Sequence, residues 1–191
     1  MVKRESCIFV CNHAGVYGPV AMEIFFPYEF RPWVISDMVY RKSCRVHLEK
    51  ELFGNVPLIV KPFCKLLTAV IEPIVIWVMR EVNAIPVYKG SKRILETMAI
   101  TIDALAKGHN IAIFLDFLDD DTEGENWSNN LGFLHLARDY YLKFGKNIYF
   151  YPVRIDRKNR RISIGNPMVY HPKNSLKEEK QRLMGVLAKM I

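Results

Sequence analysis

Short apolar runs alternate with segments of helical periodicity along most of this chain. The runs have the length of buried strands, and the segments between them repeat apolar residues at the spacing of one helix face. The expected strands are 7–11, 31–36, 84–88, 111–115, 148–155 and 161–165, and the expected helices are 19–26, 91–107, 131–144 and 175 to the end of the chain. This alternation predicts an α/β fold with a mostly parallel central sheet covered by helices and one antiparallel edge.

Local signals support several of these boundaries. Gly18-Pro19 predicts a helix that begins with proline at its first position. The DRKNR segment between the last two expected strands predicts a hairpin turn. Ser175 is followed three residues later by Glu178, the pattern of a capping box at the start of the last helix.

Composition limits the domain count and the setting. A chain of 191 residues, half of them apolar and without internal repeats, predicts a single domain over residues 1–191. The four cysteines, Cys7, Cys11, Cys44 and Cys64, lack the paired spacing of a zinc site, so we expect no metal and a reducing cytoplasmic setting. Cys7 and Cys11 are expected to be small buried strand residues.

The net charge of +7 favours an anionic partner, which could be nucleic acid, a phosphorylated metabolite or a lipid surface. No recognition helix, zinc finger or aromatic RNA-binding pattern is present, so we expect no nucleic-acid partner. Five cations lie within residues 154–161, on the expected hairpin, where they could hold an anionic membrane surface or form a solvated turn.

The most apolar stretch spans residues 66–79 and carries Glu72 and Pro73 at its middle. Fourteen residues are too few to cross a bilayer, which takes about 20. We expect a core helix here, with a segment that lies in a membrane interface as the second interpretation.

Candidate site residues fall where expected strands end and helices begin, which is where α/β sheets bind ligands. Asn12 and His13 occupy one such junction, Tyr88 to Arg93 a second and Asp116 a third. Histidine is a common general base, and His13 is the one histidine of five at such a junction. A structural role for His13 stays open on this pattern alone.

Four blocks in order, NHAGVYG, NAIPVYK, FLDFLDD and YFYPVRI, resemble those of the glycerolipid acyltransferase (lysophosphatidic acid acyltransferase-like) superfamily. The family blocks are N-H-x-x-x-x-D, G-x-I-P-V-D-R, F-P-E-G-T-R and an apolar strand with a proline. The resemblance spans roughly residues 8–172 and identifies the chain as a divergent member. It implies an acyltransferase-like fold and the transfer of a fatty acyl group from a coenzyme A or acyl-carrier-protein thioester, with no further cofactor, to a lipid-type hydroxyl or amine in phospholipid metabolism.

In this family the histidine is the general base, and the aspartate five residues later orients it. Gly18 stands in the aspartate's place. The resemblance therefore implies His13 as the base, and Asp116, in preference to Glu23, as the replacement carboxylate. Gly18→Asp would be expected to restore the family geometry. The alternative is a non-catalytic acyl- or lipid-binding relative that lost its chemistry with this aspartate.

The family's anion-binding arginines are also replaced. Lys89, with Lys92 and Arg93 close behind, takes the place of the arginine of the second block, so we expect Asn12, Lys89, Lys92 and Arg93 to bind substrate. Residues 116–125 hold six carboxylates and no cation, which suggests an acceptor with an amine or a sugar, or else a solvated loop. An EF-hand is not expected, because Asn130 stands at the twelfth position. The expected location is cytoplasmic and peripheral to the membrane.

Overall fold

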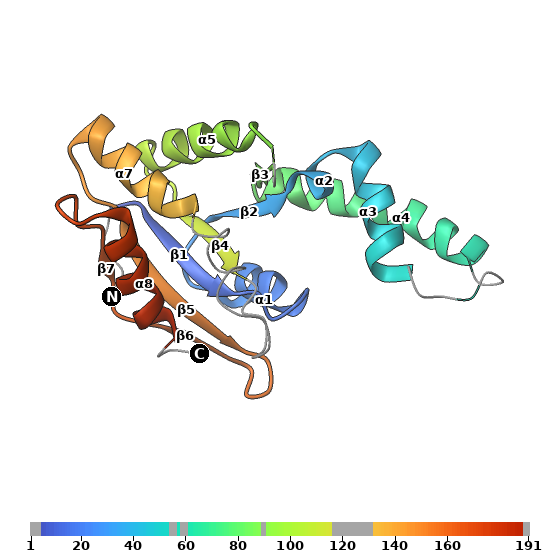
Figure 1. Ribbon diagram of the computed structural model, residues 1–191. Helices are drawn as coiled ribbons and strands as arrows, with labels where there is room; N and C mark the ends of the chain where they lie inside the picture. The colour runs from blue at the N-terminus through green and yellow to red at the C-terminus, as the bar shows by residue number, and fades with distance from the viewer. Residues whose placement is uncertain (1–4, 54–56, 58–60, 89–90, 116–131, 189–191) are drawn as a thin grey trace. The chain divides into compact units, whose positions relative to one another are not determined.

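The computed structural model describes residues 5–53, 57, 61–88, 91–115 and 132–188. The chain divides into two compact units, a first unit of residues 1–30 and 98–191 and a second unit of residues 31–97, and each is described by itself. The expected single domain over residues 1–191 stays a prediction. The elements, labelled in Figure 1, are β1 Cys7–Asn12, α1 Tyr17–Phe25, β2 Arg31–Ile35, α2 Ser36–Val39, α3 Arg41–Phe53, α4 Lys61–Glu81, β3 Ile85–Val87, α5 Ile94–Ala106, β4 Ile111–Leu115, α7 Gly132–Phe144, β5 Tyr149–Asp156, β6 Arg161–Ile164, β7 Met168–Val169 and α8 Leu176–Ala188.

The first unit is built on a mostly parallel sheet. β1 lies between β4 and β5 and runs parallel to both, and β6 and β7 each pair with β5 in the antiparallel direction. The register aligns Asn12 with Leu115 and Cys11 with Val153, so β1 and β4 end level with each other. The predicted α/β class, the parallel sheet and the antiparallel hairpin over β5 and β6 are confirmed.

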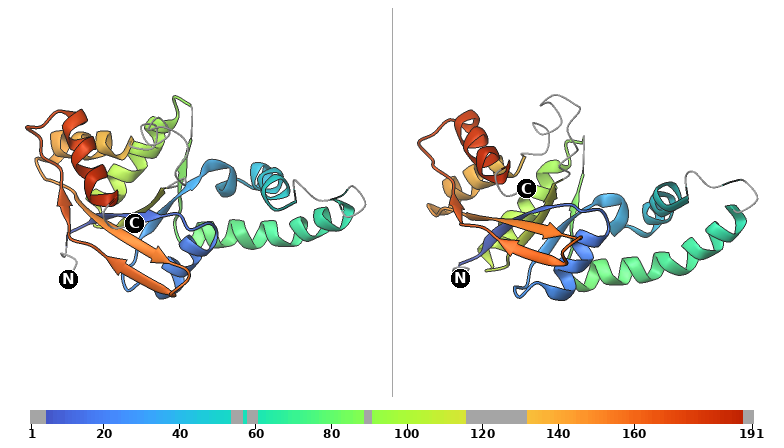
Figure 2. Two further views of the ribbon diagram at one scale, coloured as in Figure 1. Left: turned by 60° about the horizontal axis from the view of Figure 1, so that its bottom comes forward. Right: turned by 90° about the horizontal axis from the view of Figure 1, so that it is seen from below.

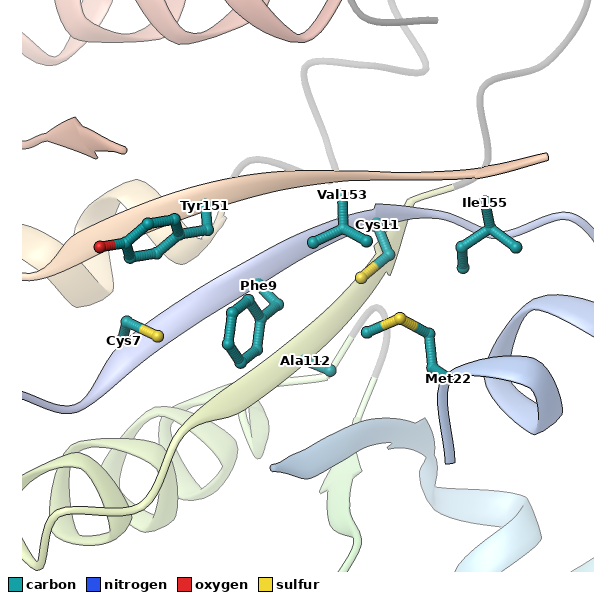
Figure 3. Close-up of a cluster of buried hydrophobic side chains, with 8 residues drawn as sticks. All are labelled: Cys7, Phe9, Cys11, Met22, Ala112, Tyr151, Val153 and Ile155. Carbon is teal, nitrogen blue, oxygen red and sulfur yellow. The ribbon is translucent and has the colours of Figure 1, made fainter. Parts of the chain in front are cut away.

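Alternate residues of the strands form a core on each face of this sheet. On one face Phe9 and Cys11 of β1 pack with Ala112 of β4, Tyr151 of β5 and Met22 of α1, as Figure 3 shows. The intervening residues point to the other face, which Figure 2 shows covered by α7 and α8. The buried residues on that side include Ile8, Val10, Ile113, Phe150, Leu134 and Leu136. Helices therefore cover both faces, as the apolar runs predicted.

Among its described residues, the second unit holds the short parallel strands β2 and β3 and the helices α2, α3 and α4. β2 pairs with β3, and Ile85 of β3 is buried. α3 and α4 pack against each other through a small apolar cluster of Cys44, Leu48 and Ile76. Helix α3 was not expected, although Cys44 and Leu48 stand four residues apart, the spacing of one helix face.

The interpretation of residues 66–79 as a core helix is wrong in part. They belong to α4, which is 21 residues long and carries Pro73 inside it. Thr68, Glu72 and Ile76 are buried, yet six large apolar side chains of this helix are exposed. By length and composition alone α4 is one candidate membrane span among the described residues, with 18% of its most apolar 18-residue window buried.

Glu72 explains why a carboxylate interrupts this apolar stretch. It lies on the buried side of α4 and accepts a hydrogen bond from Nε of Arg41 at 2.9 Å, and Nε of Arg45 lies 3.9 Å from its other oxygen. A buried carboxylate is costly unless it is paired, so these contacts from α3 fix how the two helices pack.

Two helix starts can be compared with the predictions. The capping box of α8 is confirmed, since the Ser175 amide donates to the Glu178 carboxylate at 2.7 Å and the Glu178 amide donates to the Ser175 hydroxyl at 3.2 Å. The predicted start of α1 at Pro19 is wrong by two residues, because the helix begins at Tyr17. Ala14 and Gly15, with φ of 45° and 61°, turn the chain sharply after β1, so helical geometry begins earlier than the proline indicated.

Candidate active site

His13 is the first residue after β1. Its backbone amide donates to the carbonyl oxygen of Leu115 at 3.0 Å, which extends the pairing of β1 with β4 by one step. The imidazole lies edge-on to the ring of Phe114, with the ring centres 6.2 Å apart. His13 is thus held at the carboxyl end of two neighbouring parallel strands, the position where α/β sheets bind ligands.

Asn12 extends the other side of the same strand. Its Nδ2 donates to the carbonyl oxygen of Ile155 at 3.0 Å, and its Oδ1 accepts from the amide of Ile155 at 2.6 Å. The side chain therefore takes the place of a backbone partner for β5 and ties the end of β1 to it. The role of Asn12 in substrate binding stays a prediction, and these two bonds show that its side chain also holds the strand end that carries His13.

Gly18 lies in the first turn of α1 and is buried against the turn that carries His13. A Cβ atom at this position would lie 2.1 Å from the carbonyl oxygen of His13 and 3.0 Å from its carbonyl carbon. Both are backbone atoms, so no side-chain movement relieves the overlap. The expectation that Gly18→Asp restores the family geometry is therefore wrong for this backbone, because the turn leaves no room for any side chain there.

Arg157 was not among the site residues predicted from the sequence. It follows β5 by one residue, and its guanidinium carbon lies 5.7 Å from the centre of the Tyr17 ring at the start of α1. The Asn12–Ile155 pair ties this end of β5 to the residue before His13, and Arg157 is an exposed cation two residues beyond Ile155. The run of five cations over residues 154–161 was visible in the sequence, but the pairing that places Arg157 here was not.

Lys92 and Arg93 belong to the second unit. The Arg93 guanidinium forms two hydrogen bonds to the Glu96 carboxylate, of 3.1 and 2.9 Å, and lies 3.8 Å from the centre of the Tyr88 ring. The hydroxyls of Tyr88 and Tyr40 are 2.5 Å apart. This bond from Tyr40, with burial, raises the pKa of Tyr88, so its hydroxyl is neutral at physiological pH. Lys92 is exposed.

Several predicted site residues lie outside the described residues. Lys89, Asp116 and the acidic loop over residues 116–125 are among them, so their predicted roles stay predictions. His13 and Asn12 are in the first unit, and Lys92 and Arg93 are in the second. Glu23, the less favoured carboxylate, is exposed on α1, and partial burial raises its pKa.

The described thiols offer no nucleophile beside His13. Cys7 and Cys11 are fully buried, and burial raises the pKa of Cys7 to about 12 and that of Cys11 further. A thiol in this state is not ionised at neutral pH and is inert. Within the part of the chain that the structure describes, no three His, Cys, Asp or Glu side chains are grouped to hold a metal ion.

Comparison with known proteins gives this site no family. No family model, curated protein or solved structure matches the chain.

Proposed function

We propose that the chain is a divergent acyltransferase with an acyltransferase-like fold, and that it moves a fatty acyl group from a coenzyme A or acyl-carrier-protein thioester to a lipid-type hydroxyl or amine. The observation that carries the proposal is the hydrogen bond from the His13 amide to Leu115, at the end of two parallel strands. It supports the order of motifs seen in the sequence, because the first and third blocks meet at one edge of the sheet. Asp116 is the residue that follows Leu115 in the chain.

His13 acts as general base in this mechanism. Its imidazole takes the proton from the acceptor hydroxyl or amine, and the acceptor oxygen or nitrogen attacks the thioester carbonyl. The carbon–sulfur bond then breaks, and the thiol of coenzyme A or the carrier protein leaves with a proton. Asp116 orients the imidazole and stabilises its charged form, which a side chain at position 18 cannot do.

Basic side chains near each expected strand end would bind the anionic groups of donor or acceptor. Lys89 and Lys92 are the proposed contacts from the second block. Arg157, at the end of β5, is proposed as a further contact for an anionic group. Arg93 contributes less free charge, because Glu96 already accepts two of its hydrogen bonds. Such chemistry suits a cytoplasmic enzyme of phospholipid metabolism that works on the surface of an anionic membrane.

The test of the His13–Asp116 pair is a double-mutant cycle on acyl transfer from a labelled thioester. If the two residues act together, His13→Ala, Asp116→Asn and the double variant should all lose a similar share of the rate, on the order of 10²–10⁴-fold. His135→Ala, a change at an exposed histidine of α7, is the control and should keep the parent rate. Transfer that survives His13→Ala would exclude His13 as the base.

A specific observation favours a second candidate, a non-catalytic acyl- or lipid-binding relative. The backbone at Gly18 excludes the aspartate of the family motif. This candidate predicts that an acyl thioester binds, by calorimetry, and is recovered intact after long incubation with hydroxyl and amine acceptors. Recovery of acylated acceptor would exclude it.

A further inference from the structure

Helix α4 has one side that packs against the rest of its unit and one side that is exposed. One side packs into the second unit through Thr68, Glu72 and Ile76, which are buried. Its partners include Cys44 and Leu48 of α3, and the Arg41–Glu72 ion pair fixes the contact. This side therefore already has its partner, and it leaves the opposite side of the helix to solvent.

The opposite side carries an apolar stripe. Its members recur at three- and four-residue steps, the spacing of one helix face, and between 39% and 66% of each side chain is exposed. The stripe consists of Phe63, Leu66, Leu67, Val70, Ile74 and Trp77. At 1.5 Å per residue it is about 21 Å long.

No charged residue falls within the stripe. The charged residues between Phe63 and Trp77 are Lys65 and Glu72. They stand seven residues apart, or about two helical turns, so both lie on the side away from the stripe, where Glu72 is buried and Lys65 is exposed. A continuous exposed apolar surface of this kind is uncommon on a soluble protein and marks a site of interaction.

An exposed cation stands beyond each end of the stripe. Lys61 lies two residues before Phe63, and Arg80 lies three residues after Trp77, next to the exposed Glu81. The Glu72 carboxylate is taken up by Arg41, and Glu49 lies 3.7 Å from Arg45. An amphipathic helix with lysine and arginine on its polar side and Trp, Phe and Leu on the other is typical of helices that lie in a membrane interface.

We propose that the apolar stripe of α4 docks in the interface of a lipid bilayer that contains anionic lipid. The stripe enters the boundary between headgroups and acyl chains, with the helix axis along the membrane plane, and Lys61 and Arg80 beyond its two ends contact lipid phosphates. A crossing helix is disfavoured, because α3 holds Glu72 on the other side. A second copy of this chain is disfavoured as the occupant, because two stripes packed along each other would bring the cations Lys61 and Arg80 at their ends against like charges of the other copy.

This inference goes beyond the proposed acyl transfer and does not depend on it. The stripe and its charges are observed whether or not His13 is a base. Docking would, however, give a lipid-soluble acceptor a short path to the enzyme. Membrane binding and acyl transfer are therefore measured in separate assays, so that the failure of one is distinguished from the failure of the other.

The test is flotation of the full chain with vesicles of phosphatidylcholine alone or mixed with phosphatidylglycerol. The double variant Leu66→Gln/Val70→Gln should lower the partition coefficient on mixed vesicles about tenfold or more, because two side chains no longer gain from burial. The matched control is Leu95→Gln/Leu142→Gln, which changes two similarly exposed leucines on α5 and α7 and should bind as the parent does. Thermal unfolding of both variants checks that they fold.

Binding should also fall when salt is raised, since charge is screened over about 10 Å at 0.1 M. Trp77 gives a second readout that needs no substitution in the stripe, since in a Trp33→Phe/Trp127→Phe variant its fluorescence should shift to the blue on mixed vesicles. Partition unchanged by Leu66→Gln/Val70→Gln, or equal on neutral and mixed vesicles, would overturn the proposal. So would a parent dimer that these changes dissociate, because a second copy would then be the occupant.

Discussion

The backbone at Gly18 determines where a carboxylate that serves His13 can come from. The sequence shows that the family aspartate is missing, and the structure shows why it cannot simply be put back. A Cβ atom at this position would overlap the His13 carbonyl, so the turn that positions His13 and the glycine require each other. If a carboxylate serves His13, it must come from another segment of the chain.

Gly18→Ala should destabilise the protein by about 1–3 kcal/mol or more, because the backbone of the His13 turn has to move. Gly18→Asp should do the same and should not raise acyl transfer. Chemical denaturation measures the first effect. The control is Gly185→Ala on α8, where nothing lies within 4 Å of the added Cβ atom, and it should be neutral or stabilising by up to about 1 kcal/mol. A Gly18→Asp protein of parent stability would contradict this account of the turn.

Asn12 is the second residue for which the structure shows a contact that the sequence did not indicate. Asn12→Ala should cost about 1–3 kcal/mol of unfolding free energy, because it leaves the amide and the carbonyl of Ile155 without the partners that Asn12 provides. Denaturant unfolding measures the loss, and Asn166→Ala at an exposed position is the control, expected within about 0.5 kcal/mol of the parent. A parent-like stability for Asn12→Ala together with weaker substrate binding would return Asn12 to its predicted role.

At the scale of elements, the strands were predicted well because their signal is local. A buried strand of a parallel sheet is a continuous apolar run, and β1 and β4 each have one. It is harder to predict from the sequence which side of a helix faces solvent. α4 carries apolar residues on both sides, so these residues alone do not tell which side α3 covers. Glu72 held that information, since a carboxylate in an apolar helix marks the side where a cation must approach.

The start of α8 is fixed by a buried carboxylate, Glu179. It accepts hydrogen bonds from Asn174 at 2.6 Å, from the His171 amide at 3.1 Å and from Arg182 at 2.7 Å. Arg182 also donates to the Val169 carbonyl of β7, so the cluster joins the helix to the sheet. Burial alone would raise the pKa of Glu179, but the bonds from Arg182, Asn174 and His171 outweigh it, and this pKa lies below its ordinary value of 4.5.

Glu179→Gln should therefore lower the unfolding free energy by about 1–3 kcal/mol at neutral pH. Because the folded pKa is below the unfolded one, this contribution is present above about pH 4.5 and is lost as the pH falls below it. The measurement is urea unfolding of parent and variant from pH 7 to pH 3. The difference between them should shrink toward the acidic end, and a difference that stays constant with pH would contradict the assignment.

For the whole molecule, the sequence predicted the fold class but could not assemble the site. The class follows from periodicity, which is a property of each segment. The site depends on long-range pairing, and the Asn12–Ile155 bonds join residues 143 positions apart. No local pattern encodes such a contact, which is why Arg157 was missed. His13 was found because the carboxyl end of a parallel strand is a predictable place for function.

The charge of the molecule is also distributed in a way that composition does not show. The net charge of +7 indicated an anionic partner but not where on the molecule that partner binds. The structure shows exposed cations on the hairpin of β5 and β6 in the first unit and on α3 and α4 in the second unit. Each group by itself suits an anionic ligand such as a phosphate.

The central claim is that His13 drives acyl transfer, and the most direct measurement is the fate of a labelled acyl group. The full chain is mixed in excess with a labelled acyl thioester and an acceptor panel of lysophospholipids, sugars and amines, and products are separated over a single turnover. The account predicts label on an acceptor with the parent and with His135→Ala, and none above background with His13→Ala. Intact thioester in all three samples, across the whole panel, would contradict the claim.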